Sequence, residues 1–429
     1  PFKPRHWVFY YGWAILVVAT IGHMAAIPGQ TGGITGFINP LQEALGLSEI
    51  QLSLAYMIGT LGAASLLPWA GRIYDRYGAR LMGTLVFGIF GLVFFYLASM
   101  KLGYNWLKGT ATSSWTIGMG LVIIGFFGLR FLGMGILSFL PRTMLSKWFH
   151  KKRGLTNALS GTCVALGSGS APLVSSILVG NLGWELSWLT LGLIYASVLM
   201  PLAWLMYRDT PESCHLPQDG FSNSIKTPPI TALPTLHEYT LAEAMRTRTF
   251  WLFALGIALN SALTTSVNFH AQSIEANLGM PMPSFMELFV PISCINVGVS
   301  ALASWLSMRI ALKYLLISMM GLQTVGFVGL WIAPNMIGIN FFVVGFGAAF
   351  GLYTALMICC WPILFGRLNL GAISGFALAI NLFSTSVGPL IFSLSKAWTN
   401  GYTAAYTLVI ILSLNIAWLA RRADSPQGN

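Results

Sequence analysis

Charged residues are scarce in this chain. Asp, Glu, Lys and Arg make up 8% of its 429 residues, whereas hydrophobic residues make up 55%. A soluble protein needs about a quarter of charged residues to cover its surface. The mean hydropathy is +0.72, and the apolar runs reach about 20 residues, enough to cross a hydrocarbon core of about 30 Å. This composition excludes an ordinary soluble domain and indicates a membrane protein.

The chain also lacks the side-chain groupings that catalysis requires. Acidic residues are absent from the centres of the apolar runs, and Gly167-Ser168-Gly169 has no following Lys, so it is not a phosphate loop. The cysteines show neither zinc spacing nor a disulfide framework. There are five of them: Cys163, Cys214, Cys294, Cys359 and Cys360. We therefore expect no metal, no cofactor, no enzyme activity and no drive by ATP.

Twelve apolar segments follow one another along the chain and predict an all-α membrane fold. They cover 9–37, 50–71, 79–99, 117–145, 153–179, 184–207, 248–277, 284–309, 312–333, 337–365, 370–396 and 402–420. The first segment is too long for the core of a cleavable signal peptide, so we expect it to be a membrane span.

Lys and Arg are distributed unevenly between the two sides of these segments. With a cytoplasmic N-terminus, 19 of the 23 basic residues fall inside and three fall outside (Lys101, Lys108 and Lys396). Positive charge collects on the cytoplasmic side of membrane proteins, so both termini are predicted inside. This distribution in short loops also argues against a nucleic-acid partner, despite the net charge of +11.

The longest polar stretch, 208–247, divides the segments six and six. It is rich in proline, and we predict that it is a linker whose end, Thr240 to Glu243, caps a short helix. Weak repeats relate residues 1–207 to residues 248–429. Gly169 to Leu173 in the fifth segment matches Ser386 to Leu390 in the eleventh, and Phe37 to Glu43 can be laid over Phe269 to Glu275. Such repeats are typical of secondary transporters.

A basic decapeptide stands between the second and third segments: Gly71-Arg72-Ile73-Tyr74-Asp75-Arg76-Tyr77-Gly78-Ala79-Arg80. Its Gly-x-x-x-Asp-Arg-x-Gly-x-Arg pattern resembles the loop between helices two and three of the major facilitator superfamily. Three further stretches resemble the monocarboxylate and oxalate–formate branch of that family. They are Lys147 to Leu155, Arg208 to Glu212 and Leu241 to Trp251. The resemblance implies two six-helix bundles around a central cavity.

The chain also departs from that branch. Where carboxylate carriers often have Arg in helix eight, this sequence has Ser300, and residues 370–395 of helix eleven contain no Lys. Gly32 stands where the animal monocarboxylate carriers have a Lys. The second copy of the loop pattern, Ser304 to Arg309, lacks its Asp. The resemblance therefore implies the fold and the branch but leaves the charge of the substrate open.

Arg130 lies near the middle of the fourth segment. A cation there costs about 3 kcal/mol or more unless it is paired or hydrated. A stripe suited to helix contact is formed by Gly118, Gly125, Gly128 and Gly135. Arg130 lies about 140° from this stripe around the helix, so its side chain is predicted to face either a cavity or lipid. Arg130 either attracts an anionic substrate or tunes a proton site, or else it is a clamp that donates to carbonyls of neighbouring helices.

Further polar side chains in the first and seventh segments are candidate substrate contacts. His23, Gln30 and Thr31 share one face of the first segment, although Pro28 bends it. A histidine can titrate near neutral pH, so His23 is either a proton carrier or a packing residue. In the seventh segment a broad arc holds the candidates Asn260, Thr264 and Asn268 together with Ser261 and Gln272.

Four more candidates complete the predicted substrate site. His270 projects about 160° away from Asn268, so it either packs near the membrane interface or carries a proton. Asn296, Tyr353 and Asn381 are inward-facing candidates in segments eight, ten and eleven, although such groups also join helices. In the decapeptide, Arg72, Asp75, Arg76 and Arg80 are expected to form an ion-pair cluster. In the family this cluster latches the inner gate. Alternatively, the positive charges only keep this loop on the cytoplasmic side of the membrane.

These patterns predict a secondary transporter in the cell membrane, with an N-terminal bundle (1–207), a linker (208–247) and a C-terminal bundle (248–429). It would carry a small polar organic solute, with a carboxylate-type anion favoured and protons as a candidate coupling ion. We expect a monomer. The alternatives are a uniporter or exchanger of a neutral polar solute, a membrane sensor built on a carrier fold, and a channel.

Overall fold

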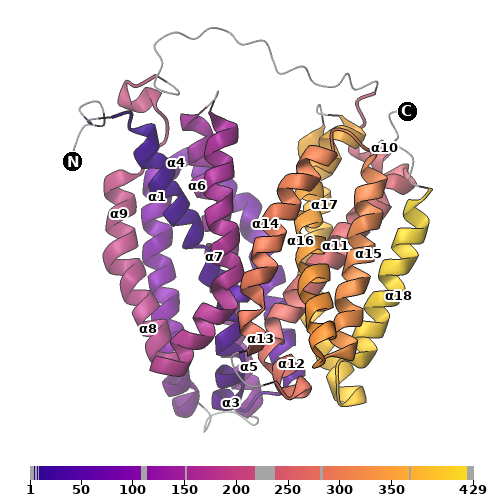
Figure 1. Ribbon diagram of the computed structural model, residues 1–429. Coiled ribbons are helices and arrows are strands. Elements are labelled where there is room, and N and C mark those ends of the chain that lie inside the picture. Colours follow the sequence, from indigo (N-terminus) through magenta and orange to yellow (C-terminus); the bar gives the residue numbers. More distant parts are fainter. Residues whose placement is uncertain are drawn as a thin grey trace. The chain divides into compact units, whose positions relative to one another are not determined.

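The structure of the chain is a computed structural model. It describes residues 4, 7, 9–107, 114–149, 152–217, 237–280, 284–366 and 369–422 (Figure 1). All regular elements in this part of the chain are helices, which confirms the predicted all-α class. The chain divides into two compact units, Pro1–Ile225 and Lys226–Asn429, so the boundary falls within the predicted linker.

Among the described residues of unit 1 there are nine α-helices, together with 3₁₀ and π segments. The α-helices are α1 (Gly12–Met24), α2 (Thr31–Ile34), α3 (Ile38–Leu45), α4 (Glu49–Leu107), α5 (Ser114–Gly128), α6 (Ser138–Trp148), α7 (Arg153–Leu182), α8 (Trp184–Ile194) and α9 (Met200–Met206). Between them lie 3₁₀ turns at Ile27–Gly29, Thr35–Phe37 and Glu212–Cys214 and π-helices at Leu129–Leu137 (η4) and Tyr195–Leu199 (η5).

Unit 2 contains the remaining helices. They are α10 (Leu241–Arg246), α11 (Arg248–Phe269), α12 (Ala271–Leu278), α13 (Ser284–Glu287), α14 (Phe289–Leu306), α15 (Leu312–Ile332), α16 (Met336–Phe365), α17 (Leu370–Thr399) and α18 (Thr403–Ala420). Helix α10 begins with the predicted capping box, since Thr240 accepts from the Glu243 amide and Glu243 accepts from the Thr240 amide.

Twelve stretches of the described residues are long and apolar enough to cross a membrane, and each overlaps one predicted segment. Helix α4 supplies two of them, because Gly78, with φ +77° and ψ 172°, turns the chain between the second and third spans. Such a backbone conformation is accessible mainly to glycine. The third span continues to Leu107, beyond the predicted end at residue 99.

Two predicted segments are interrupted rather than continuous. The first was predicted as one run over 9–37, but α1 ends at Met24 and Gln30 is extended, with φ −88° and ψ 162°. Pro28 lies in the turn that precedes Gln30, where its fixed φ and missing N–H favour a break. The seventh was predicted to reach residue 277, but His270 separates α11 from α12.

The short helices α3 and α12 adopt the same structure in the two units. Both have eight residues and end at a left-handed glycine, Gly46 with φ +60° and Gly279 with φ +66°. The closing bonds also correspond: Leu47 N donates to Gln42 O, and Met280 N donates to Glu275 O. Superposed on these helix ends, Gln42 corresponds to Glu275, one residue out of register with the alignment of the sequences.

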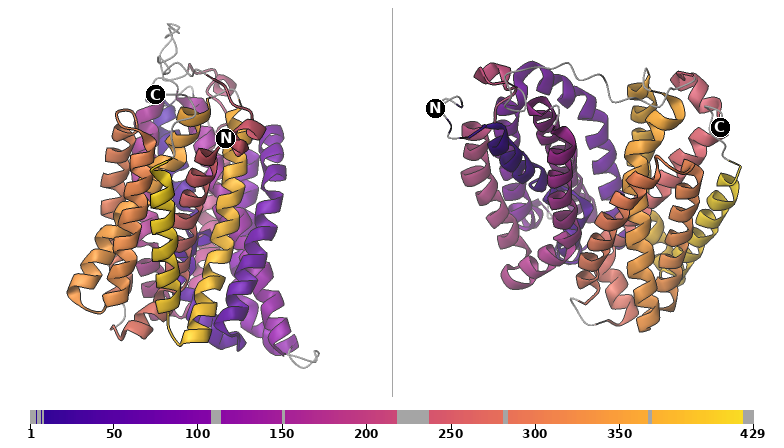
Figure 2. Two further views of the ribbon diagram at one scale, coloured as in Figure 1. Left: turned by 90° about the vertical axis from the view of Figure 1, so that its right-hand side faces the viewer. Right: turned by 45° about the horizontal axis from the view of Figure 1, so that its top comes forward.

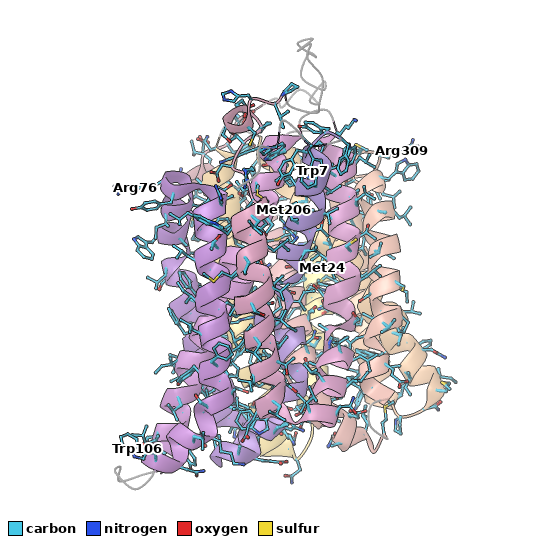
Figure 3. All side chains as sticks on the ribbon, turned by 90° about the vertical axis from the view of Figure 1, so that its left-hand side faces the viewer. Trp7, Met24, Arg76, Trp106, Met206 and Arg309 are labelled. Carbon is cyan, nitrogen blue, oxygen red and sulfur yellow. The ribbon has the colours of Figure 1, made fainter. Side chains whose placement is uncertain are left out.

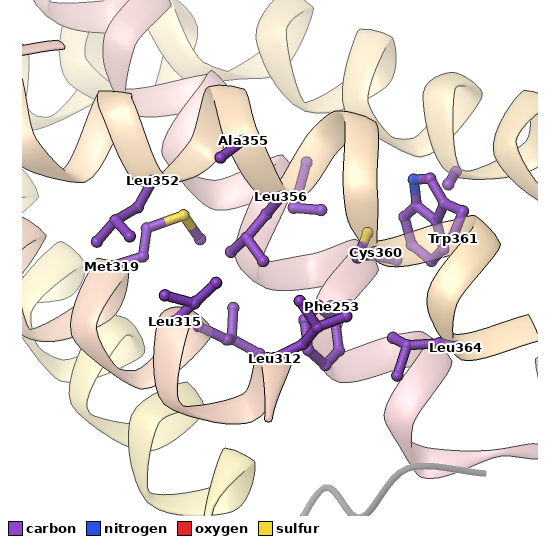
Figure 4. Close-up of a cluster of buried hydrophobic side chains, with 14 of the residues drawn as sticks. Phe253, Leu312, Leu315, Met319, Leu352, Ala355, Leu356, Cys360, Trp361 and Leu364 are labelled. Atoms are coloured by element: carbon purple, nitrogen blue, oxygen red, sulfur yellow. The ribbon is translucent and has the colours of Figure 1, made fainter. Parts of the chain in front are cut away.

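The core of unit 2 is a dry cluster of apolar side chains. Phe253 of α11 packs with residues of α15 and α16 that Figure 4 shows in close-up, among them Leu315, Met319, Leu356 and Trp361. These side chains are 3% exposed or less. In lipid, helix association depends on this close packing, since apolar side chains gain little by leaving hydrocarbon for protein.

Helices α15 and α16 approach each other through glycines and stay adjacent in both views of Figure 2, where they are orange. A Cβ placed on Gly326 would lie 2.9 Å from the Phe346 backbone nitrogen and 3.3 Å from the Gly345 carbonyl carbon. Backbone atoms cannot rotate away, so the contact requires glycine. Gly321, one and a half turns earlier on α15, has no atom within 4 Å of its built Cβ.

We predict that Gly326→Ala destabilises the protein by about 1–3 kcal/mol, because the added methyl group overpacks the α15–α16 contact. Thermal unfolding of the purified protein in detergent measures the effect. The matched control Gly321→Ala should be neutral or stabilise by up to about 1 kcal/mol, since alanine is the better helix former. Equal melting temperatures for the two variants would contradict the tight contact.

Candidate functional site

Arg130 forms a buried polar cluster in unit 1. Its guanidinium donates from Nε to Thr60 Oγ1 (3.3 Å), from Nη1 to Gly29 O (3.3 Å) and from Nη2 to the Tyr56 hydroxyl. It also lies 4.8 Å from the centroid of the Tyr56 ring, in cation–π geometry. The Tyr56 hydroxyl is 2.8 Å from Thr31 Oγ1. Arg130 is 3% exposed, and none of these partners carries a negative charge.

These contacts agree with the interpretation of Arg130 as a clamp between helices, and its position at a cavity stays a prediction. Arg130 belongs to the π-helix η4, whose wider turn changes the direction of the side chain. The break at Gln30 leaves the Gly29 carbonyl outside a regular α-helix, where it can accept from Arg130. The predicted glycine contacts do form, since Gly125 packs on Leu97 of α4.

Two further side chains hold the broken first span. The Tyr195 hydroxyl of η5 donates to the carbonyl of Ala25, and Ser168 of α7 donates to Gln30 Oε1 at 3.2 Å. Backbone groups within a membrane need such partners, because no bulk water is available. The predicted residues Gln30 and Thr31 therefore lie in one region with Arg130. Thr31 is connected to Arg130 by the Tyr56 hydroxyl, and Gln30 follows Gly29, whose carbonyl accepts from Arg130.

His23 lies earlier on α1 and is not joined to this cluster. Its side chain is 3% exposed, and its ring forms no hydrogen bond with the described residues. The packing interpretation of His23 thus agrees with its position, and its proposed proton role is untested.

The predicted gate is described only in part. The side chains of Arg72 and Asp75 lie outside the described residues. Arg76 is exposed and lies over the Tyr77 ring; Figure 3 shows it projecting from unit 1 at the end opposite Trp106. Arg80 donates from Nε to the Trp204 carbonyl (2.8 Å) and its guanidinium carbon lies 4.4 Å from the centroid of the Trp204 ring.

Asp209 is a functional candidate that the sequence did not identify. Its Oδ1 accepts from the backbone amides of Ala79 and Arg80, the first helical residues after Gly78. A carboxylate at this position satisfies free amide groups and interacts favourably with the helix dipole. Asp209 thereby ties the chain after α9 to the start of the third span. A Cβ on Gly78 would collide with its carboxylate.

In unit 2, three helices bring polar groups together at Tyr353. Asn381 Nδ2 of α17 donates to the Tyr353 hydroxyl (3.2 Å), and that hydroxyl donates to Ser261 Oγ of α11 (3.5 Å). Tyr353 is half-buried and belongs to α16. The structure thus brings two predicted site residues, Tyr353 and Asn381, to one neutral cluster with Ser261.

Asn260 points away from this cluster, although it neighbours Ser261 in sequence. Its Nδ2 donates to Gln323 Oε1 of α15 (2.9 Å), and Gln323 Nε2 donates to Ser413 Oγ of α18 (2.7 Å). All three residues are at most 3% exposed. Asn260 therefore joins helices and is separate from the Tyr353 cluster. The single arc predicted for the seventh segment divides at this point.

Two other candidates make bonds within their own helix, and a third joins two helices. Thr264 and Asn268 donate to the backbone carbonyls of Asn260 and Thr264, one turn earlier on α11. Asn296 of α14 accepts from Thr354 Oγ1 of α16 at 3.4 Å. Both Thr264 and Asn268 are half-buried.

His270 joins the end of α11 to α17. Its Nε2 lies 2.9 Å from the Pro389 carbonyl and 3.3 Å from Ser393 Oγ, and its Nδ1 lies 3.4 Å from the Tyr402 hydroxyl. Because a carbonyl can only accept, Nε2 carries a proton in this arrangement. The ring is 2% exposed, so His270 is a packed interhelix contact, which agrees with the packing interpretation.

Tyr56 and Thr60 were missed by the sequence analysis. Both lie on the second span, four residues apart, so they share one helix face. Polar groups at this spacing within an apolar run were the signal that could have found them. Gln323, a polar residue within an apolar run, was also missed; it is 1% exposed.

The family model described as Major Facilitator Superfamily matches residues 19–389. The chain belongs to this superfamily. The match covers most of the chain and agrees with the twelve spans, so the protein is a multi-pass membrane protein of a transporter family. Membership of a transporter family implies a small-molecule substrate.

Two curated proteins are similar to this chain at low sequence identity. It is 24% identical to an oxalate:formate antiporter of Oxalobacter formigenes over 67% of this chain, and 26% identical to an uncharacterised MFS-type transporter, YhjX, of Escherichia coli (strain K12) over 51%. The matched region spans 59% of the first relative's length and 47% of the second's.

Solved transporters share the fold. A bacterial homologue of the human lysosomal transporter Spinster, inward-facing and occupied, aligns with a TM-score of 0.72 at 14% identity, covering 100% of this chain and 99% of its own. A D-xylose-proton symporter aligns with a TM-score of 0.66 at 16% identity, covering 97% and 99%. At these identities the likeness shows the fold alone.

We predict that Asp209→Ala destabilises this superfamily protein by about 0.5–2 kcal/mol, the usual cost of losing a helix cap. Thermal unfolding in detergent measures it. Asp209→Asn should retain most of the stability, because the amide oxygen can still accept from the two amides. The exposed neighbour Glu212→Ala is the control and should not change the melting temperature. An unchanged melting temperature of Asp209→Ala would show that the cap does not contribute to stability.

Proposed function

We propose that this superfamily member is a secondary transporter that exchanges small carboxylate anions across the membrane. The observation that carries the proposal is the Arg130 cluster: a guanidinium 3% exposed within a span and held, among the described residues, by neutral groups alone. Tyr56, Thr60 and Gly29 satisfy its donors but leave its charge uncompensated. An anion that reaches it would supply the missing charge.

A carboxylate suits this cluster chemically. Arg presents a planar fork that pairs with the two oxygens of a carboxylate, and such charged hydrogen bonds are roughly twice as strong as neutral ones. The hydroxyls of Tyr56 and Thr60, now bonded to Arg130, could turn to donate to the bound anion. The curated relative named as an oxalate:formate antiporter supports this choice of substrate class.

The neutral Tyr353–Ser261–Asn381 cluster is our candidate for further substrate contacts in unit 2. Its hydroxyl and amide groups can hydrogen-bond either a carboxylate or a neutral polar solute. A neutral polar solute is therefore the second candidate, favoured by Ser300 in the helix-eight position and by the lack of a basic residue in 370–395.

Transport would proceed by alternating access, in which the two halves move relative to each other, with both termini cytoplasmic as the basic residues indicate. Asp209, Arg80 and Trp204 would then act on the cytoplasmic side of unit 1 as part of the gate. Protons remain a candidate coupling ion, and a monomer is the assumed working unit.

We predict that Arg130→Gln weakens exchange of labelled oxalate against formate in proteoliposomes by about 10- to 100-fold, the worth of a charged hydrogen bond. Arg130→Lys should retain part of the activity because it keeps the charge. Oxalate should also raise the melting temperature of the wild type but not of Arg130→Gln. The exposed Arg309→Gln is the control.

The same experiment separates substrate binding from a purely structural clamp. If Arg130 only joins helices, Arg130→Gln lowers the melting temperature and leaves the KM of the folded fraction unchanged, which would contradict the proposal. Wild-type uptake of labelled D-xylose that survives Arg130→Gln, without oxalate exchange, would instead establish the neutral solute.

Tyr353→Phe should raise the KM for oxalate by about 2- to 10-fold with little change in kcat, because one neutral hydrogen bond to the substrate is lost. Initial rates in proteoliposomes over a range of oxalate concentrations measure both constants. The exposed Tyr314→Phe serves as the matched control. An unchanged KM would remove Tyr353 from the proposed site.

A further inference from the structure

Glu275 of α12 is a buried carboxyl group that the proposed transport site does not use. The side chain is 0% exposed, Oε1 accepts from the Phe285 amide at 3.1 Å, and Oε2 has no hydrogen-bond partner among the described residues. An ionised carboxylate is an acceptor on both oxygens, so a bare and buried oxygen is unfavourable for the charged form. The neutral acid tolerates this environment better.

The repeat in unit 1 shows what the position accommodates. Gln42 of α3 corresponds to Glu275, because the same closing bonds, Leu47 N to Gln42 O (3.1 Å) and Met280 N to Glu275 O (3.2 Å), fix the register. Both helices then end at a left-handed glycine. A neutral amide thus occupies in one unit the place of a carboxyl in the other. Protonated Glu resembles Gln in shape and charge.

The charged surroundings also favour the neutral form. Helices α11 and α13 pack against α12, and Glu287 of α13 is the charged group that acts on Glu275. Burial raises the pKa of the Glu275 carboxyl, the bond from the Phe285 amide lowers it, and Glu287 raises it. Of the basic groups nearby, Lys396 of α17 donates to Ser273 of α12, and His270 is bonded to the Pro389 carbonyl of α17.

We propose that Glu275 is a proton-binding site of this transporter. With a proton bound, the carboxyl stays buried and accepts from the Phe285 amide; when the proton leaves, a bare buried carboxylate remains and weakens the packing of α12 against α13. Figure 1 places these helices at the end of unit 2 away from α10. The proton site itself requires no substrate, whereas its role as the coupling site rests on the proposed transport function.

The direction of the pH effect follows from the raised pKa. A carboxyl group with a higher pKa in the folded protein contributes stability that is complete at low pH and is lost as the pH rises through the folded value. The packing of α12 against α13 should therefore be most stable in acid and should weaken as the solution becomes alkaline.

Melting temperatures of the purified protein from about pH 5 to about pH 8 test the proton site without any substrate. We expect the wild type to lose about 2–4 °C more than Glu275→Gln over this range. Glu43→Gln, which removes an exposed carboxyl from α3, should melt like the wild type at every pH. Parallel profiles for the wild type and Glu275→Gln would overturn the proposal.

Glu287→Gln provides a second test that does not alter Glu275. Removing the neighbouring negative charge should lower the pKa of Glu275 and shift the wild-type transition to lower pH, so the variant should lose less stability than the wild type between acid and neutral pH. A transition that stays in place would overturn the assignment to Glu275. This test remains decisive even if Glu275→Gln does not fold.

Oxalate–formate exchange measured over the same pH range tests the coupling role. We expect exchange by the wild type to change with pH and exchange by Glu275→Gln to be nearly constant. If melting depends on Glu275 but no oxalate is exchanged, the proton site stands and the proposed substrate fails. If exchange depends on pH identically in both proteins, the coupling role of Glu275 is wrong.

Discussion

The contact between Arg130 and the broken first span is the interaction on which unit 1 depends. A membrane offers no bulk water, so a guanidinium and an interrupted helix each need partners from the protein. Here they satisfy one another, because the Gly29 carbonyl accepts from Arg130. Tyr56 and Thr60 complete the cluster from the second span. The charge nevertheless lacks a carboxylate partner among the described residues, and this imbalance makes the cluster suited to an anion.

The two units differ in the polar groups that they bury within their helices. Unit 1 concentrates its polarity around a cation, whereas unit 2 offers the neutral groups of Tyr353, Ser261 and Asn381. A similar contrast holds at the repeated short helices, where Gln42 and Glu275 share a position but not an ionisable group. Divergence within a shared backbone framework is how a repeated fold can combine substrate binding with a response to protons.

The fold could be predicted from the sequence because a bilayer imposes a simple rule on length and polarity. Runs of about 20 apolar residues have to be helices there, since only a helix satisfies its own backbone. Arg130 was identified for the same reason, as a charge where charges are costly. Tyr56 was missed, because a tyrosine within an apolar run carries no comparable signal until its partners are known.

By itself, the sequence determined the twelve spans, the linker position and the candidate status of Arg130, Tyr353 and Asn381, since these depend on composition along the chain. Only the tertiary structure decided where the side chains point. The π-helix at Arg130 and the extended Gln30 change direction in ways that ideal helix geometry does not contain. The one-residue register between α3 and α12 was likewise set by their closing hydrogen bonds, which exist only in the folded chain.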